Sequence, residues 1–313
     1  MKVGVIGTGK MGENHVRTYL SMYDHCQLVG IYDNNENKSQ QIAQKYKVKQ
    51  FQSIDDLLQS VDAVSIAVPT EFHYDIGLAC IQQNVHMLME KPVTSTVAQA
   101  ENLLYKSREK GVKLQVGHIE LFNPLIQVLT KMLRHETIVG LIFHRMSPVD
   151  ERIKHVDVVK DLMIHDLYIL NELVRDSVVA YYAFGKVIDN TPIHAAAITR
   201  SSQGVTAQFT ASFKSRKKVR NIQILTEDAF ITADILNREI KTTHAVVEDT
   251  SNTPVPAWQT IQIDDSLQPL SVQLLDFINC ITFDREPSVS GEDGLNVLMI
   301  TNEISESIIN YKD

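Results

Sequence analysis

Two sets of residues in this sequence carry side chains that can move a proton at neutral pH. Lys91 stands between Glu90 and Pro92. The proline removes a backbone donor and biases Lys91 toward an extended conformation, which directs its ammonium group. Asp161 and His165 are four residues apart, so on a helix they are neighbours on one face. A carboxylate there holds an imidazole in one tautomer and leaves the other nitrogen for a substrate.

Each set also has an ordinary structural explanation. A lysine at the end of a strand is as often a solvated side chain as a catalytic one. An aspartate and a histidine at this spacing often make a simple hydrogen bond on the helix surface. A metal site is a third interpretation of Asp161 and His165. Because no third ligand stands at a recognisable spacing, we predict no metal.

A glycine-rich turn near the start of the chain is typical of dinucleotide binding. Apolar residues 2–6 lead into a G-T-G-K-M-G run, and helix-compatible residues 14–22 follow. The first glycine permits a tight turn, the second lets the backbone approach a pyrophosphate, and the third allows close packing of the helix, whose first N–H groups face the phosphates. The predicted pyrophosphate site consists of Gly7, Gly9, Lys10, Met11 and Gly12.

Asp33 is the acidic residue that this signature requires. It follows Gly12 by 21 residues, at the end of a second apolar segment at residues 27–32. Such a carboxylate accepts the ribose hydroxyls of NAD and repels the 2′-phosphate of NADP, so we expect NAD as the cofactor and NADP to be less suited. The alternative is that Asp33 only forms a turn with the asparagines that follow it.

Composition limits the other functions. With 313 residues, 44% of them hydrophobic, the chain is long enough for two domains with substantial cores. The net charge of −8 argues against a general nucleic-acid binder. The densest basic run, residues 214–220, lies between two strand-like segments, so we interpret it as a solvated hairpin connection rather than a ligand site.

The cysteines and the hydropathy pattern predict a cytoplasmic location. Cys26, Cys80 and Cys280 are scattered and form no C-x-x-C pair, which favours free thiols in a reducing compartment. No signal peptide is visible, and no apolar run reaches membrane-spanning length. We therefore expect neither a membrane nor a nucleic acid among the partners.

Strands and helices alternate in the first part of the chain, which predicts a parallel, doubly wound Rossmann sheet in an α/β domain at residues 1–119. The expected strands are residues 2–6, 27–32, 48–51, 63–68, 85–89 and 113–117. Helical spacing is clearest at residues 74–83 and 97–110.

The pattern changes after Pro124, and we assign residues 120–313 to an α+β domain on a mostly antiparallel sheet. Its expected elements are a helix at 125–134, a strand at 141–146, a helix at 158–173, several strands and two terminal helices. In strand 205–213 apolar and polar residues alternate, so one face packs on helices while the other is open. That open face is either solvated or the place where subunits meet. Ser290 with Asp293 forms a capping-box pattern before the last helix.

Taken together, these motifs resemble the glucose-fructose oxidoreductase and inositol dehydrogenase family (Gfo/Idh/MocA) over nearly the whole length. The resemblance rests on Gly7-x-Gly9-x-x-Gly12 with Asn14-His15, Val68-Pro69-Thr70-x-x-His73, Glu90-Lys91-Pro92, Gly117-His118 and Asp161-x-x-x-His165. It implies hydride transfer between NAD and a secondary alcohol of a sugar or cyclitol.

The resemblance also implies roles for single residues. Lys91 and His165 would lie beside the reacting carbon, either one accepting the proton, with Asp161 orienting the histidine. Pro69, Thr70 and His73 would line the nicotinamide side of the cofactor, and Glu90 and Lys91 are also expected to bind the cofactor. The open sheet would form the contact of a homodimer or homotetramer.

Within the family, residues 117–124 and the His165-Asp166 pair look most like the branch that oxidises position 3 of UDP-N-acetylglucosamine. Basic residues ahead of the catalytic helix would receive a diphosphate; they are Arg145, Arg152, Lys154 and His155. A solvated basic face is the alternative. The predicted substrate-binding set is Lys91, His118, Arg145, Arg152 and His165.

Departures from the family pattern leave the substrate open. Leu121 stands where relatives usually have arginine, Tyr168 where many have aspartate, and residues 156–159 where a glycine-rich turn is usual. An inositol or simple-sugar dehydrogenase is therefore an alternative, and a non-catalytic dinucleotide-binding redox sensor is a second class. Retention of Lys91 with Asp161 and His165 favours the enzyme.

Overall fold

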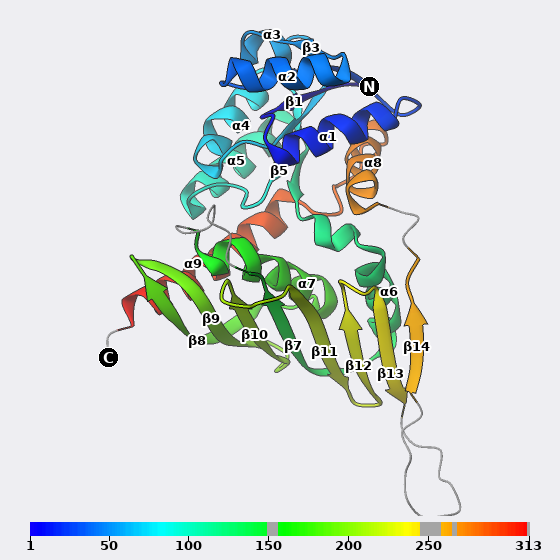
Figure 1. Ribbon diagram of the computed structural model, residues 1–313, viewed down its shortest axis with the longest axis vertical. Coiled ribbons are helices and arrows are strands. Elements are labelled where there is room, and N and C mark those ends of the chain that lie inside the picture. Colours follow the sequence, from blue (N-terminus) through cyan, green and yellow to red (C-terminus); the bar gives the residue numbers. More distant parts are fainter. Residues whose placement is uncertain (149–155, 245–257, 265–267, 312–313) are drawn as a thin grey trace, which may run out of the picture. The chain divides into compact units, whose positions relative to one another are not determined.

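The computed structural model describes residues 1–148, 156–244, 258–264 and 268–311 (Figure 1). The chain divides into two compact units. The first contains residues 1–122 and 267–298, and the second contains residues 123–266 and 299–313.

The first unit is built on a six-stranded parallel sheet with the strand order β3-β2-β1-β4-β5-β6. Its strands are β1 (Lys2–Ile6), β2 (Gln27–Tyr32), β3 (Lys49–Gln50), β4 (Ala63–Ile66), β5 (His86–Glu90) and β6 (Leu114–Gly117). This order reverses between β1 and β4, and such a reversal is where doubly wound sheets bind ligands beyond the carboxyl ends of their strands. The predicted Rossmann sheet is confirmed, although β3 is shorter than expected.

Helices connect these strands and cover the sheet. They are α1 (Lys10–Ser21), α2 (Glu36–Tyr46), α3 (Ile54–Leu58), α4 (His73–Gln82), α5 (Val97–Lys110) and the short 3-10 turns Thr70–Phe72 and Ile119–Phe122. Helix α5 has the predicted bounds because both ends are capped. The Thr96 hydroxyl accepts a hydrogen bond from Gln99 N at 3.3 Å, and Gly111 ends the helix at φ 64°.

The penultimate helix, α8 (Pro269–Thr282), also belongs to the first unit. Its residues Leu274 and Phe277 are fully buried in one apolar cluster with Val3, Val16 and Tyr19 of β1 and α1. This differs from the expected division at residues 119 and 120, because the apolar face of α8 covers the first sheet. The final helix α9 (Gly291–Asn310) opens with the predicted capping box.

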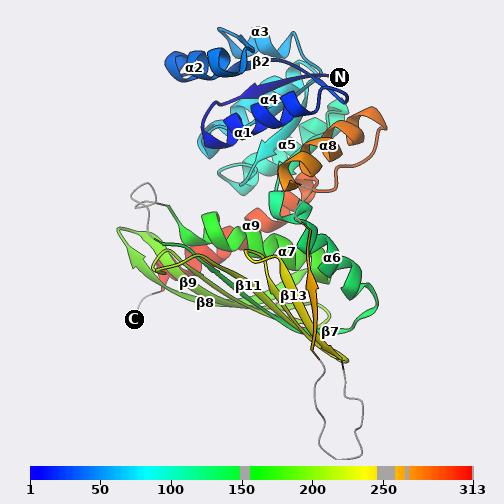
Figure 2. The same ribbon diagram turned by 45° about the vertical axis from the view of Figure 1, so that its right-hand side comes forward.

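The second unit is built on an eight-stranded sheet with the order β14-β13-β12-β11-β7-β10-β9-β8, antiparallel except where β7 and β10 run parallel. Its strands are β7 (Ile138–Met146), β8 (Val178–Ile188), β9 (Thr191–Ser201), β10 (Thr206–Ser212), β11 (Val219–Thr226), β12 (Ala229–Asp234), β13 (Glu239–His244) and β14 (Trp258–Gln262). Helices α6 (Pro124–Met132) and α7 (Ile164–Val174) lie on one face (Figure 2).

The alternation predicted for β10 is confirmed. Ala207, Phe209 and Ala211 are each 1% exposed, whereas Thr206 and Gln208 on the opposite face are exposed. The basic run is not in a hairpin, however. It leaves β10 and enters β11, and β7 lies between these strands, so the connection crosses the end of β7.

The three cysteines are buried free thiols. Burial raises the pKa of Cys26 to about 11 and that of Cys80 to about 12, so neither thiol is a nucleophile at neutral pH. Among the described residues, the helices lack the length and apolar character needed to cross a bilayer.

Candidate functional site

The glycine-rich turn joins β1 to α1 and presents bare backbone. Gly7 has φ +93°, and a Cβ added there would collide with the carbonyl of Ala67. A Cβ on Gly12 would collide with the carbonyl oxygen of Gly7. Nothing lies within 4 Å of the position that a Cβ on Gly9 would take. The backbone is therefore tightly packed at Gly7 and Gly12, and there is free space beside Gly9. This space suits a pyrophosphate at the N-terminus of α1.

The Asp33 carboxylate, at the end of β2, ties this turn to its neighbours. Its Oδ2 accepts hydrogen bonds from Thr8 N at 2.6 Å and from Thr8 Oγ1 at 2.8 Å, while Oδ1 accepts one from Asn35 N at 2.8 Å. The last contact is an Asx turn, so the alternative role as a turn former applies as well. Asp33 also lines the pocket beside the turn.

That pocket has a volume of about 420 Å³. It is lined by Ile6, Gly7, Gly9, Tyr32, Asp33, Asn34, Asn35, Lys38, Ile54, Ala67, Val68, Pro69, Phe72, Asp75 and Ile76. The predicted Thr70 and His73 are not among these residues. The sequence prediction missed Lys38 and Phe72. Phe72 is 47% exposed and offers an aromatic face for a base. Its position in the sequence, between the predicted cofactor residues Thr70 and His73, could have indicated it.

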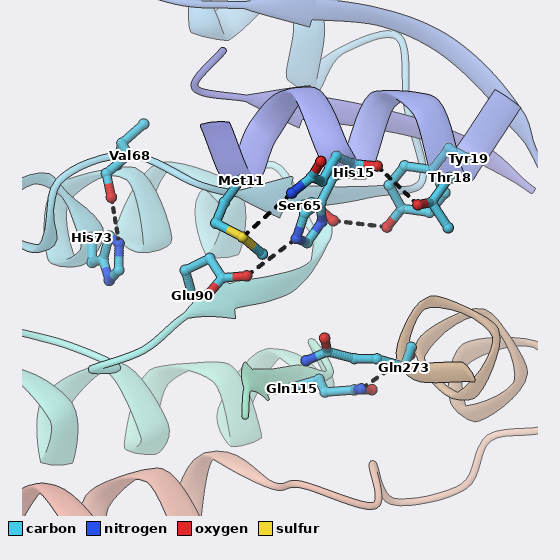
Figure 3. A network of polar contacts seen from close by, with 11 residues as sticks. Met11, His15, Thr18, Tyr19, Ser65, Val68, His73, Glu90, Gln115 and Gln273 are labelled. Carbon is cyan, nitrogen blue, oxygen red and sulfur yellow. Dashed lines mark hydrogen bonds and ion pairs between the residues drawn. The ribbon is translucent and has the colours of Figure 1, made fainter. Parts of the chain in front are cut away.

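The segment after β5 carries Lys91. Glu90 ends the strand, and its Oε1 lies 3.1 Å from Nε2 of His15 on α1 (Figure 3). The Lys91–Pro92 peptide bond is cis. The carbonyl oxygen of Pro92 lies 2.9 Å from Nδ1 of His73. The structure therefore puts Glu90, Lys91 and Pro92 in one turn at the carboxyl edge of the parallel sheet.

His118 follows β6 on the same edge of the sheet. It is 1% exposed, and burial, with a smaller effect of the Lys91 charge, lowers its pKa well below the ordinary value. Its imidazole is therefore neutral at pH 7. A neutral histidine can hydrogen-bond a sugar hydroxyl without a charge, and the substrate-binding role of His118 stays a prediction.

In the second unit, Asp161 and His165 lie where two helical geometries meet. Residues Val159–Met163 form a π-helical turn, and α7 begins at Ile164. The Asp157 carboxylate accepts hydrogen bonds from Val159 N at 2.8 Å and from the Ser305 hydroxyl of α9. Because a π turn has more residues than an α turn, the shared face predicted from the four-residue spacing stays a prediction.

Arg145 does not form the open cationic approach that the sequence suggested. It is 1% exposed on β7, and its Nε donates to Asp166 Oδ1 of α7 at 2.8 Å. Leu141 and Phe143 are buried on the same face of the strand. The charge of Arg145 is thus balanced inside the unit, which speaks against a direct diphosphate contact. Arg152, Lys154 and His155 lie outside the described residues.

Comparison with known proteins places the chain in a family. Residues 1–118 match a family model described as oxidoreductase family, NAD-binding Rossmann fold (Gfo/Idh/MocA). The chain is 30% identical to UDP-N-acetylglucosamine 3-dehydrogenase of Acidithiobacillus ferrooxidans, over 98% of this chain and 97% of that protein. It is 23% identical to myo-inositol 2-dehydrogenase of Thermotoga maritima, over 98% and 96% of the two chains.

A solved structure of the A. ferrooxidans UDP-N-acetylglucosamine 3-dehydrogenase superposes with a TM-score of 0.93 at 29% identity, covering 99% of this chain and 97% of that one. The glycine turn, the acidic end of β2 and the Glu90-Lys91-Pro92 turn thus occur in a chain that matches such dehydrogenases along its full length. The chain belongs to the Gfo/Idh/MocA family of dehydrogenases with an NAD-binding Rossmann domain.

Proposed function

We propose that this sugar oxidoreductase acts on a nucleotide-activated amino sugar, UDP-N-acetylglucosamine or a close derivative, and oxidises a secondary hydroxyl of its ring. The observation that carries the proposal is the similarity to UDP-N-acetylglucosamine 3-dehydrogenase, which extends over 98% of the chain and so includes the second unit as well as the Rossmann unit. A shared Rossmann domain alone would support only dinucleotide binding.

The cofactor in this proposal is NAD rather than NADP. The bare backbone at Gly9 and the first turn of α1 would hold the pyrophosphate, Asp33 would face the adenosine ribose, and Phe72 would stack on the base. When bound, the nicotinamide supplies the acceptor for a hydride. The Asp33 carboxylate favours NAD because its charge opposes a 2′-phosphate.

Lys91 or His165 takes the hydroxyl proton as the hydride leaves carbon. Only the neutral form of either side chain can act as the base. A histidine is near the useful pKa of about 6.5, whereas a lysine, ordinarily at about 10.4, needs burial or a neighbouring positive charge to lose its proton. Asp161 orients His165, and His118 binds the sugar. The diphosphate is assigned to Arg152, while the burial of Arg145 removes that residue from the proposed substrate contacts.

Isotope transfer tests the proposed reaction. UDP-N-acetylglucosamine carrying deuterium at ring carbon 3 should give deuterated NADH and a sugar product that has lost the deuterium and the hydroxyl hydrogen, as measured by mass spectrometry. NADH without deuterium would mean that another carbon is oxidised. No NADH at all from this substrate would overturn the substrate assignment.

We also propose that the open face of the eight-stranded sheet joins subunits into a homodimer or homotetramer. Apolar side chains stand on this face. Tyr182 is 76% exposed, Ile198 is 51% exposed, and the two lie directly opposite each other on β8 and β9. Trp258 of β14 is 52% exposed. Light scattering after size exclusion should give a mass above the 35.3 kDa of one chain, and Ile198→Asp should reduce it; a monomeric wild type would contradict the proposal.

A further inference from the structure

The residues on either side of Lys91 are each held by a buried histidine. Glu90, before it, contacts His15 of α1 (Figure 3). Pro92, after it, contacts His73 of α4. The two histidines come from different helices and reach the same three-residue turn. Neither ring is among the residues that line the dinucleotide pocket.

His15 fixes Glu90 by a hydrogen bond of defined direction. Its side chain is fully buried, one turn after Gly12, and Nε2 lies 3.1 Å from Glu90 Oε1. A carboxylate can only accept, so Nε2 carries the hydrogen. Nδ1 has no hydrogen-bond partner among the described residues. A bare Nδ1 costs less than a buried N–H left unbonded, so this geometry favours the tautomer with its hydrogen on Nε2.

Glu90 is confined from its other side by Gly117. The two residues are directly paired between β5 and β6. A Cβ built on Gly117 would stand 2.9 Å from Glu90 Cα and 3.0 Å from its carboxylate carbon. The Glu90 side chain is only 13% exposed. It therefore occupies the space that the glycine leaves and has a single position between α1 and β6.

His73 holds the other end of the turn. It is 1% exposed, with Nδ1 2.9 Å from the carbonyl oxygen of Pro92 and Nε2 3.0 Å from the carbonyl oxygen of Val68. Val68 follows β4, and Pro92 follows β5. The ring thus lies between the two segments that leave neighbouring strands and fixes their separation.

We propose that His15 and His73 are positioning residues for Lys91. By holding the residue before and the residue after the lysine, they give its amine one place relative to the parallel sheet. The inference rests on the catalytic role proposed above for Lys91. A misplacement of about 1 Å in a reacting group costs on the order of a hundredfold in rate, so loss of either contact should lower turnover without a matching loss of NAD affinity.

The test compares leucine at both positions and glutamine at position 15. His15→Leu and His73→Leu should lower kcat by about ten- to a hundredfold and leave the Kd for NADH within about threefold. Glutamine can place an amide nitrogen near the position of Nε2 and donate to Glu90 in its place. If the hydrogen bond to Glu90 is what matters, His15→Gln should therefore keep most of the wild-type turnover. The substrate is the one that the wild type oxidises fastest, whatever its identity.

Tyr19→Phe is the matched control. Tyr19 is fully buried on α1, one turn beyond His15, and its hydroxyl lies 2.8 Å from Ser65 Oγ. This variant also removes a buried hydrogen bond from the same helix but does not touch the Lys91 turn. It should lower the thermal midpoint as His15→Leu does and leave kcat unchanged. An equal fall of kcat in Tyr19→Phe would show that His15 acts only through the stability of α1.

Lys91→Met separates this inference from the proposed function. Loss of turnover in Lys91→Met with normal kcat in both leucine variants would overturn the inference alone. Normal turnover in Lys91→Met would overturn the catalytic role of Lys91 and the inference with it. If His15→Leu does not fold, Glu90→Leu removes the acceptor of the same contact, and full activity in that variant would equally contradict the role of His15.

Discussion

Asp33 gives the sharpest prediction about cofactor choice. Its carboxylate accepts three hydrogen bonds, from the amide and hydroxyl of Thr8 and from the amide of Asn35. Asp33→Ala would therefore remove all three hydrogen bonds and loosen the glycine-rich turn for both cofactors. Asp33→Asn keeps one oxygen for the two contacts with Thr8 and loses only the contact with Asn35 N. It removes the charge with the smaller structural change, so it is the better test of the electrostatic effect on the 2′-phosphate.

The size of that effect follows from the exposure of the pocket. Two unit charges 4 Å apart interact by about 1 kcal/mol in water and about 4 kcal/mol at the effective dielectric near a protein surface. Asp33 is partly exposed, so we take about 1.4 kcal/mol, which is tenfold in affinity. The wild type should bind NADH at least about tenfold more tightly than NADPH. Asp33→Asn should bring the two affinities within about threefold, mainly by tighter NADPH binding.

Fluorescence titration with both reduced cofactors measures this ratio. Lys38→Ala is the matched control, because Lys38 lines the same pocket with the opposite charge; it should weaken NADPH and leave NADH nearly unchanged. Equal affinities in the wild type, or a ratio that Asp33→Asn does not change, would refute the electrostatic role of Asp33.

Three further predictions concern catalysis and stability. Lys91→Met and His165→Asn should each lower kcat about a hundredfold with NADH affinity within a few fold; near-normal turnover in steady-state assays would favour the redox-sensor alternative. Phe277→Ala should lower the unfolding free energy by about 3–5 kcal/mol, because the ring is fully buried between α8 and the first sheet; urea denaturation measures it, and a loss below about 1 kcal/mol would contradict that packing. Burial lowers the pKa of His73 and of His118, so below pH of about 6.5 the unfolded chain binds more protons and stability should fall from pH 7 to pH 5; an unchanged urea midpoint would oppose this.

Local signals in the sequence were enough for the first sheet and its turn. Glycines at fixed spacing, the apolar strands and the caps of α5 all act within a few residues, and the predicted bounds of α5 agree with the structure. Local signals could not predict that α8 belongs to the first unit. Leu274 and Phe277 indicate a buried face but do not say which surface covers it, and the partner residues in β1 and α1 lie more than 250 positions away.

The site shows the same limit. The contact between His15 and Glu90 joins residues 75 positions apart, and no spacing rule connects them. The burial of Arg145 was within reach, because strand alternation puts it on the face of Leu141 and Phe143. Its partner Asp166 could not be predicted, because the contact depends on how α7 packs on β7. The π turn before α7 also carries no sequence signal that periodicity detects.

The most direct test of the proposed function is the rate of NADH formation from four substrates under one set of conditions. They are UDP-N-acetylglucosamine, free N-acetylglucosamine, glucose and myo-inositol. Binding energy from the nucleotide should help to hold the ring for reaction, so the truncated sugar should lose turnover as well as affinity. The account predicts the fastest NADH formation from UDP-N-acetylglucosamine; faster oxidation of any free sugar or of myo-inositol would contradict it.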